Sequence, residues 1–321
     1  MPFHVLISDN VDKRAVALLQ QNPDIRVTFN GDLPREQAIA AIADADALVI
    51  RSATKADAAL LGYATNLKAI ARAGVGVDNV DLDFATDKGI VVMNTPDGNT
   101  ISTAEFTFGL MLSLARHIPQ AHGSLAGGKW DRKSFTGVEL RGKTLGIVGF
   151  GRIGRQVAKR ALAFDMNVIA YDPFVLPDMA ADLGVAMVNL DTLYAQSDFV
   201  TLHTTVTDES RYMINAATLS KMKKGVRIIN AARGVLINDA DLAEAIKSGQ
   251  VGGAALDVFE PEPPSADNPL MGLAGVVHTP HLAASTSDAQ NNVALDAAQL
   301  ILDALLQGRY ANVCNPKVLH K

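Results

Sequence analysis

A glycine-rich turn near the middle of the chain is the first segment whose residue spacing suggests chemistry. Gly149, Gly151 and Gly154 form a G-x-G-x-x-G pattern between an apolar, strand-like run and a helix-like segment. In that context the first glycine makes the turn, the second lets the backbone approach a pyrophosphate, and the third allows the helix to pack closely on the strand. The free N–H groups at the start of the helix favour the same anion. The pattern therefore predicts a dinucleotide site, with Arg152 and Ile153 among its contacts.

An acidic residue follows this turn at the distance expected for a ribose contact. Asp172 ends the next strand-like run, roughly 20 residues after the glycines. Its carboxylate would accept hydrogen bonds from the adenosine ribose hydroxyls and would repel a 2′-phosphate, which favours NAD over NADP as the cofactor. A glycine-rich turn that binds no ligand is the alternative interpretation.

Three ionisable residues in the second half of the chain could perform acid–base chemistry. Arg233, Glu262 and His281 each lie just beyond a strand-like run. Ligands of open α/β sheets bind outside the carboxyl ends of the strands, so these side chains can meet in one cleft. There a histidine would take the hydroxyl proton as C2 of a 2-hydroxy acid gives up hydride, a carboxylate would orient the ring, and an arginine would bind the substrate carboxylate or polarise its oxygen. Taken singly, each of these residues is more often structural or merely exposed.

The elements that must position these residues follow from an alternation of short apolar runs with helix-like segments. This alternation indicates two doubly wound α/β domains with parallel sheets. In the first domain, strands are expected at residues 5–8, 25–29, 47–50, 69–71 and 91–94. In the second, they are expected at residues 144–148, 167–171, 199–202, 227–230, 253–257 and 276–278.

Two longer helices are expected to connect the domains. Residues 102–117 are apolar on several sides, which predicts a buried helix that crosses from the first domain to the second. A final helix from Ser287 to about Leu306 has apolar residues at helical spacing but no strand left to join it in the second domain. We expect this helix to return to the first domain.

The composition limits the class of protein. With 321 residues, of which 48% are hydrophobic and 20% charged, the chain is typical of a globular protein of two domains. The net charge of −5 argues against nucleic-acid binding, and no apolar run is long enough to span a bilayer or resembles a signal peptide. The single cysteine, Cys314, excludes an intrachain disulfide and is expected to be structural. We therefore expect a cytoplasmic protein, and no metal site is predicted.

Several segments taken together resemble the D-isomer-specific 2-hydroxyacid dehydrogenases. The resemblance covers nearly the whole chain and is carried by residues 74–81, 94–99, 231–234, 255–259, 262–264 and 279–282. It implies a Rossmann NAD-binding domain at residues 99–285, inserted into a discontinuous flavodoxin-like substrate domain at residues 1–98 and 286–321. It also implies a homodimer joined through the cofactor domains.

The resemblance also implies roles for single residues. Arg233, Glu262 and His281 match the catalytic residues of the family, with His281 as the acid–base group. Further cofactor contacts are implied for Thr204, Ala231, Ala232, Arg233, Asp257, His281 and Ala284, and substrate contacts for Val75, Gly76, Asn99, Arg233 and His281. The chain departs from the family pattern at Thr205, where proline is usual, at Ala283 and Ala284, where glycine is usual, and at Val75, where threonine is common. These departures concern fine contacts with the cofactor and not the reaction.

An arginine-bearing segment suggests the substrate. Arg51, Ser52 and Arg72, together with residues 128–133, resemble the members that convert 3-phosphoglycerate to 3-phosphohydroxypyruvate in serine biosynthesis. Both arginines follow strands of the first domain, where their guanidinium groups would bind a phosphate. Ordinary surface charges are the alternative. The chain resembles the short members that lack C-terminal regulatory domains, so serine feedback through such a domain is not expected.

Other functions stay open at this point. Glyoxylate, hydroxypyruvate or a sulfonated hydroxy acid could replace the phosphorylated substrate without any change of mechanism. An NAD-sensing binding protein, similar to the transcriptional corepressors that resemble this family, would retain the same three residues.

Overall fold

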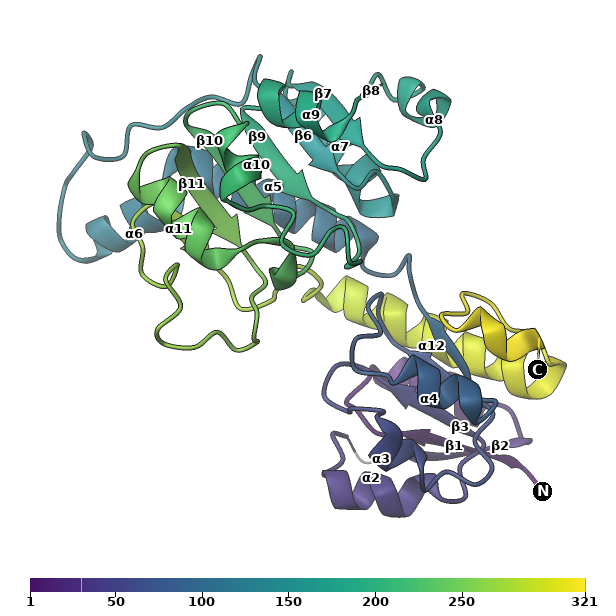
Figure 1. The fold of residues 1–321 in the computed structure, drawn as a ribbon. Helices are drawn as coiled ribbons and strands as arrows, with labels where there is room; N and C mark the ends of the chain where they lie inside the picture. Colours follow the sequence, from purple (N-terminus) through teal and green to yellow (C-terminus); the bar gives the residue numbers. More distant parts are fainter. Residues whose placement is uncertain (30, 321) are drawn as a thin grey trace. The chain divides into compact units, whose positions relative to one another are not determined.

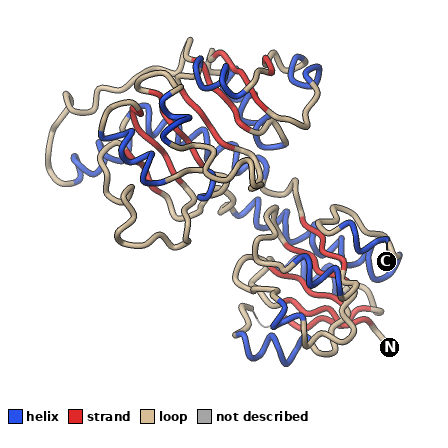
Figure 2. Tube along the Cα trace, viewed as in Figure 1, coloured by secondary structure: helices blue, strands red, loops and turns tan. Residues whose placement is uncertain are grey.

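The computed structural model describes residues 1–29 and 31–320, and the chain divides into two units (Figure 1). One unit joins Met1–Thr100 to Ser285–Lys321, and the other is Ile101–Ala284. In each unit, strands are flanked by helices (Figure 2). Within the described ranges, no helix is long and apolar enough to cross a membrane.

The first unit is built on five parallel strands in the order β2-β1-β3-β4-β5. The strands are β1 (Phe3–Ile7), β2 (Ile25–Phe29), β3 (Ala47–Ile50), β4 (Ala69–Arg72) and β5 (Val91–Asn94). This is the strand order of a flavodoxin-like domain, which the family resemblance implied, and its topological switch point lies between β1 and β3. The loops after these two strands are therefore placed to form a binding site.

Helices cover both faces of this sheet because successive side chains of a strand point to opposite faces. Val5 and Ile7 of β1 pack with α1 (Lys13–Gln20) and α12 (Ser287–Gln307). Leu6 points to the other face and belongs to a separate core. That second face is covered by α2 (Arg35–Ile42), α3 (Ala58–Leu61) and α4 (Leu82–Asp87).

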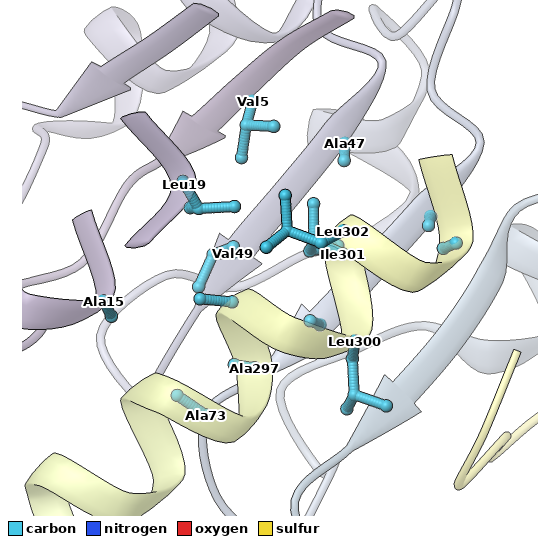
Figure 3. Packing of buried hydrophobic residues seen from close by; sticks show 14 of the residues in the cluster. Val5, Ala15, Leu19, Ala47, Val49, Ala73, Ala297, Leu300, Ile301 and Leu302 are labelled. Carbon is cyan, nitrogen blue, oxygen red and sulfur yellow. The ribbon is translucent and has the colours of Figure 1, made fainter. Parts of the chain in front are cut away.

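The last long helix, α12, returns to the first unit as the sequence predicted. Figure 3 shows Ala297, Ile301 and Leu302 of α12 in the cluster that includes Val5 and Val49 of the sheet. A helix of 21 residues with this apolar face gains its stability from packing on a sheet rather than from propensity alone.

The segment after α12 is attached to β5 by one buried side chain. Asn315 is 5% exposed, and its Oδ1 accepts a hydrogen bond from the Val92 N–H at 2.9 Å. Its Nδ2 donates to the Ile90 carbonyl at 2.9 Å and to Thr86 Oγ1 at 3.0 Å. The neighbouring Cys314 makes a main-chain bond to Val92 and a weak thiol contact with Asn312, and burial raises the pKa of its thiol.

The second unit contains seven parallel strands in the order β12-β11-β10-β9-β6-β7-β8. Counted from β6, this is the Rossmann order 3-2-1-4-5-6 with one added strand. The strands are β6 (Thr144–Val148), β7 (Asn167–Tyr171), β8 (Ala186–Met187), β9 (Phe199–Leu202), β10 (Val226–Asn230), β11 (Val251–Leu256) and β12 (Val276–His278). The fold class predicted for both domains is therefore confirmed.

Helices lie on both faces of this sheet as well. One core contains residues of α5 (Thr100–Arg116) and α7 (Arg152–Ala163), and the other contains residues of α9 (Leu190–Gln196), α10 (Ala216–Ser220) and α11 (Asp239–Lys247). The remaining elements of this unit are α6 (Ile118–Ala126), α8 (Pro177–Ala181) and a 3-10 turn at Gly234–Leu236.

Two expectations about these elements need correction, and one strand was not predicted. The helix expected at residues 102–117 ends at Arg116, because His117 adopts a left-handed backbone conformation (φ 54°) and a new helix, α6, begins after it. Nor is α5 buried all round, since Ile101 is 48% exposed and Gly109 also lies on the exposed side. The edge strand β8 has only two residues and gave no recognisable pattern in the sequence.

We predict that Asn315→Ala lowers the free energy of unfolding by about 2–4 kcal/mol, because it leaves the buried N–H of Val92 and the carbonyl of Ile90 without partners. Urea unfolding followed by circular dichroism measures this loss. Cys314→Ala is the matched control and should cost about 1 kcal/mol or less, because it keeps every main-chain bond of the segment. Equal losses in the two variants would contradict the anchoring role of Asn315.

Candidate active site

The glycine-rich turn lies at the switch point of the second sheet, between the carboxyl ends of β6 and β9. Gly149 has φ +93°, and a Cβ there would lie 2.5 Å from the carbonyl carbon of His203. A Cβ on Gly154 would collide with the carbonyl oxygen of Gly149, whereas a Cβ on Gly151 would meet nothing within 4 Å. The open space at Gly151, at the start of α7, leaves room for a pyrophosphate close to the backbone. The turn therefore fits NAD.

Asp172 supports this turn in a way the sequence did not reveal. Its Oδ2 accepts a hydrogen bond from the Phe150 N–H at 2.8 Å, and its Oδ1 accepts one from the Phe174 N–H at 2.8 Å. A carboxylate offers about four acceptor positions, so two remain for ribose hydroxyls. Asp172 is thus able to hold the glycine turn and a ribose at the same time.

The other predicted cofactor residues lie on loops that follow strands of the second sheet. Three of them are half-buried: Thr204 after β9, Arg233 after β10 and Ala284 after β12. Arg152, at the start of α7, is exposed. Ala232 donates its N–H to Asn230 Oδ1 at 3.0 Å, which fixes the turn after β10, and Ala231 is buried beside it.

Asp257 has a function in the structure that the sequence prediction missed. Its side chain is fully buried, and its carboxylate accepts hydrogen bonds from the Thr279 hydroxyl at 2.6 Å and from the N–H groups of Leu282 and Ala283 at 2.8 Å each. Its carbonyl oxygen accepts the N–H of His281 at 2.8 Å. Asp257 therefore holds the loop that carries His281, and most of its acceptor positions are already used.

His281 and Glu262 form a direct pair. His281 Nδ1 lies 2.7 Å from Glu262 Oε2, and the other oxygen of that carboxylate accepts the Phe259 N–H at 3.0 Å. A carboxylate at Nδ1 favours the tautomer that carries its proton there, which leaves Nε2 as an acceptor. Both side chains are partly exposed to solvent. The pair is thus arranged as a proton acceptor with an orienting carboxylate.

Arg233 is brought to the same edge of the sheet. It lies just after β10 at the start of the 3-10 turn, where its Nη1 donates to the Ala232 carbonyl at 2.7 Å and its own carbonyl accepts from Asn230 Nδ2 at 2.8 Å. A side chain on the next residue, Gly234, would collide with the main chain of Phe259. The turn that carries Arg233 therefore packs directly on the segment that leads to Glu262.

The remaining predicted substrate residues lie in the first unit. Arg51 follows β3, and its Nη1 donates to the carbonyl of Asn10 at 3.2 Å. The guanidinium of Arg72, at the end of β4, lies against Gly74. The carbonyl of Val75 accepts from Asn94 Nδ2 at 2.6 Å. The last three are Ser52, which is exposed in the loop after β3, Gly76, which is half-buried, and Asn99, whose Oδ1 is buried and has no donor among the described residues.

A second histidine near the glycine turn is not a competing base. His203 follows β9, and its Nε2 lies 3.0 Å from Thr201 Oγ1. Burial lowers the pKa of His203 to about 3, so its imidazole is neutral near pH 7. In the part of the chain that the structure describes, no group of three or more histidine, cysteine or carboxylate side chains could hold a metal ion.

Comparison with known proteins identifies the family. Residues 108–283 match the model for the NAD-binding domain of the D-isomer specific 2-hydroxyacid dehydrogenases. The chain is 47% identical to the hydroxypyruvate reductase of Thermotoga maritima over 94% of its own length and 98% of that protein. The structure of a glyoxylate reductase from Paecilomyes thermophila superposes with a TM-score of 0.88 at 30% identity and covers 98% of both chains. The chain belongs to the D-isomer specific 2-hydroxyacid dehydrogenases and contains their NAD-binding domain.

One group of relatives is longer than this chain. The D-3-phosphoglycerate dehydrogenase of Archaeoglobus fulgidus is 50% identical over 93% of this chain, but the match covers only 56% of that protein. The chain thus spans a little over half the length of the D-3-phosphoglycerate dehydrogenases that it matches.

We predict that Asp172→Ala weakens NADH binding and narrows the preference for NADH over NADPH, because it removes a ribose acceptor together with a charge that repels the 2′-phosphate. Titration of cofactor fluorescence measures both dissociation constants. Asp172→Asn is the informative control, since it keeps an acceptor for the Phe150 N–H but not the charge. If both variants keep the wild-type preference, Asp172 does not select the cofactor.

Proposed function

We propose that the chain is an NAD-dependent dehydrogenase that transfers hydride between NAD and C2 of a D-2-hydroxy acid. The observation that carries this proposal is the 2.7 Å contact between His281 Nδ1 and Glu262 Oε2, on a loop held by the buried Asp257. This pair follows two adjacent strands of the sheet that also carries the glycine turn. A proton acceptor and a dinucleotide turn on one sheet are what hydride transfer from an alcohol requires.

Each residue then has a chemical task. When bound, NAD supplies the nicotinamide ring that accepts or returns the hydride. His281 Nε2 takes the proton of the C2 hydroxyl during oxidation and returns it during reduction. Glu262 keeps the ring in the productive tautomer and stabilises the imidazolium that forms. Arg233 binds the substrate carboxylate or polarises the C2 oxygen.

The substrate we favour is 3-phosphoglycerate, with 3-phosphohydroxypyruvate as the product. Several relatives named D-3-phosphoglycerate dehydrogenase are 44–50% identical over most of this chain. Arg51 follows β3 and Arg72 is the last residue of the neighbouring strand β4, where two guanidinium groups can bind a phosphate. A cytoplasmic location and a place in serine biosynthesis belong to the same proposal.

A second candidate is the reduction of hydroxypyruvate or glyoxylate. The Thermotoga maritima relative named hydroxypyruvate reductase is 47% identical over 94% of this chain. Both candidates use the same three catalytic residues and differ in the group that Arg51 would bind.

A homodimer formed through the NAD-binding domain is part of the proposal. A groove of about 590 Å³ in the second unit is lined by apolar residues of α5, by α6, and by β12, the edge strand of the sheet. The amide oxygen of Gln120 in this groove is buried and has no donor in the described ranges. Nearby on α6, Ile118 and Leu125 are more than half exposed. A second copy of the chain would cover these surfaces.

We predict that His281→Ala lowers kcat by about 10²–10⁴-fold while NADH binding stays nearly unchanged. Glu262→Gln should come close to the same loss, because an amide that donates to Nδ1 would place the ring proton on Nε2. Glu260→Gln, at a neighbouring exposed carboxylate, is the control. Steady-state kinetics with a panel of 2-keto acids measures these effects. A His281→Ala enzyme with more than half the wild-type kcat would remove His281 from the mechanism.

We also predict that the wild type turns over 3-phosphohydroxypyruvate with a kcat/KM about 10²–10⁴-fold above that for hydroxypyruvate, because the unphosphorylated acid leaves charged donors without partners. Arg51→Ala should lose activity mainly on the phosphorylated acid. No preference in the wild type, or an equal loss on both acids, would favour the hydroxypyruvate candidate instead.

Finally, we predict that Gly109→Arg converts a dimer into monomers. Gly109 lines the groove, and a Cβ at this position meets nothing within 4 Å in the chain itself. A long charged side chain should therefore be tolerated by the fold but should block a partner. Gly109→Ala is the control and should stay dimeric. Sedimentation velocity distinguishes the two states, and a wild type that sediments as a monomer at micromolar concentration would refute the dimer.

A further inference from the structure

A buried carboxylate lies beneath the loop that carries Arg51. Asp9 lies two residues beyond the end of β1 and is 2% exposed. Its Oδ2 accepts hydrogen bonds from the N–H of Arg51 at 2.6 Å and from the N–H of Thr54 at 3.2 Å, and its Oδ1 accepts the hydroxyl of Thr54. All of these donors belong to a single loop, residues 51–54, which follows the adjacent strand β3.

A second side chain holds the carbonyl groups of the same two residues. Asn79 Nδ2 donates to the carbonyl oxygens of Arg51 and Thr54, each at 2.7 Å. The main chain of Asn79 also accepts the Ala56 N–H at 2.8 Å. The N–H groups of Arg51 and Thr54 are thus held by Asp9 and their carbonyl groups by Asn79, so both ends of the loop are fixed.

The two residues between these fixed points remain available to a ligand. Ser52 and Ala53 are exposed, and within residues 1–29 and 31–320 nothing accepts a hydrogen bond from either N–H group. Arg51 Nη1, in the same loop, donates a hydrogen bond to the carbonyl oxygen of Asn10 at 3.2 Å. Successive main-chain N–H groups in a turn, next to an arginine, are suited to bind an anion.

We propose that Asp9 and Asn79 are positioning residues that hold residues 51–54 as the binding loop for the anionic group of the substrate farthest from C2. The inference rests on the proposed function, because that function places an anionic group there. An internal carboxylate can do this without repelling the substrate, since hydrogen bonds from the loop itself offset its charge. Preorganisation of this kind improves substrate binding rather than the chemical step.

The test compares variants of the full chain with 3-phosphohydroxypyruvate and with hydroxypyruvate. Asp9→Asn replaces one acceptor oxygen by an NH2 group, which cannot accept a hydrogen bond from the loop. It should therefore raise KM for the phosphorylated acid by about 10–100-fold. Its kcat, and its kcat/KM for the unphosphorylated acid, should change by less than about threefold. A purely structural role would instead lower activity on both acids and weaken NADH binding. Asp9→Asn that keeps the wild-type KM, or loses equally on both acids, overturns the inference while leaving the proposed function intact.

A second pair of variants, at Thr54, tests the inference if Asp9→Asn does not fold. Thr54→Val has nearly the same shape and removes the hydroxyl bond to Asp9 together with the 2.8 Å bond between Thr54 Oγ1 and Ser8 Oγ, whereas Thr54→Ser can keep both. Thr54→Val should raise KM for the phosphorylated acid several-fold, about the effect of one or two hydrogen bonds, and Thr54→Ser should behave as the wild type. Equal KM values in the two variants overturn the inference.

A wild type without preference for the phosphorylated acid would refute the proposed substrate, and binding of inorganic phosphate then decides the inference. Amide hydrogen exchange at Ser52 and Ala53 should slow when phosphate is added to the wild type and should not change in Asp9→Asn. No protection by phosphate in the wild type overturns the inference.

Discussion

The geometry of the candidate site depends on the hydrogen bonds that Asp257 makes inside the protein. His281 adopts a left-handed backbone conformation (φ +55°), which is unfavourable for a residue with a side chain and persists only where the surroundings impose it. Asp257 imposes it by accepting hydrogen bonds on both sides of His281, from Thr279 and from Leu282 and Ala283. The imidazole is therefore directed by the loop before any substrate binds, and Glu262 completes its orientation.

Close approach of main chains explains how a sheet of short parallel strands gathers these groups. Gly149 allows the turn after β6 to lie on the segment after β9, and Gly234 allows the turn after β10 to lie on the segment after β11. A side chain at either position would push the two contacting segments apart. These segments carry the dinucleotide turn, Arg233 and Glu262. Parallel sheets make this arrangement natural, because the carboxyl ends of all strands share one edge.

The sequence predicted most of the fold because buried parallel strands are short, continuous apolar runs. The strands at residues 25–29, 91–94 and 276–278 were predicted with the boundaries observed. Strand β8 escaped notice because two residues carry no pattern, and α6 because the left-handed His117 hides the start of a new helix. The family and the glycine turn were also recognisable from residue types and spacing.

What the sequence could not supply was the set of partners distant along the chain. Only the fold brings these residues together. Examples are the hydrogen bond from Phe150 to Asp172, the bonds from Asp257 to the loop of His281, and the bonds of Asp9 and Asn79 to residues 51–54. For Asp257 the sequence suggested a cofactor contact, because it matches a family position, but gave no sign of its hydrogen bonds to Thr279, Leu282 and Ala283. Such partners carry no local signal, since an aspartate at a strand end looks the same whether it binds a ligand or a loop.

The central claim is that hydride leaves C2 of a D-2-hydroxy acid and reaches NAD directly. The most direct measurement uses the D and L isomers of 3-phosphoglycerate and of glycerate labelled with deuterium at C2, followed by mass spectrometry of the NADH formed. NADH formed from the D isomer of the preferred acid should carry one deuterium, and the L isomer should yield no labelled NADH. Unlabelled NADH from the labelled D isomer, or transfer from the L isomer, would contradict this claim.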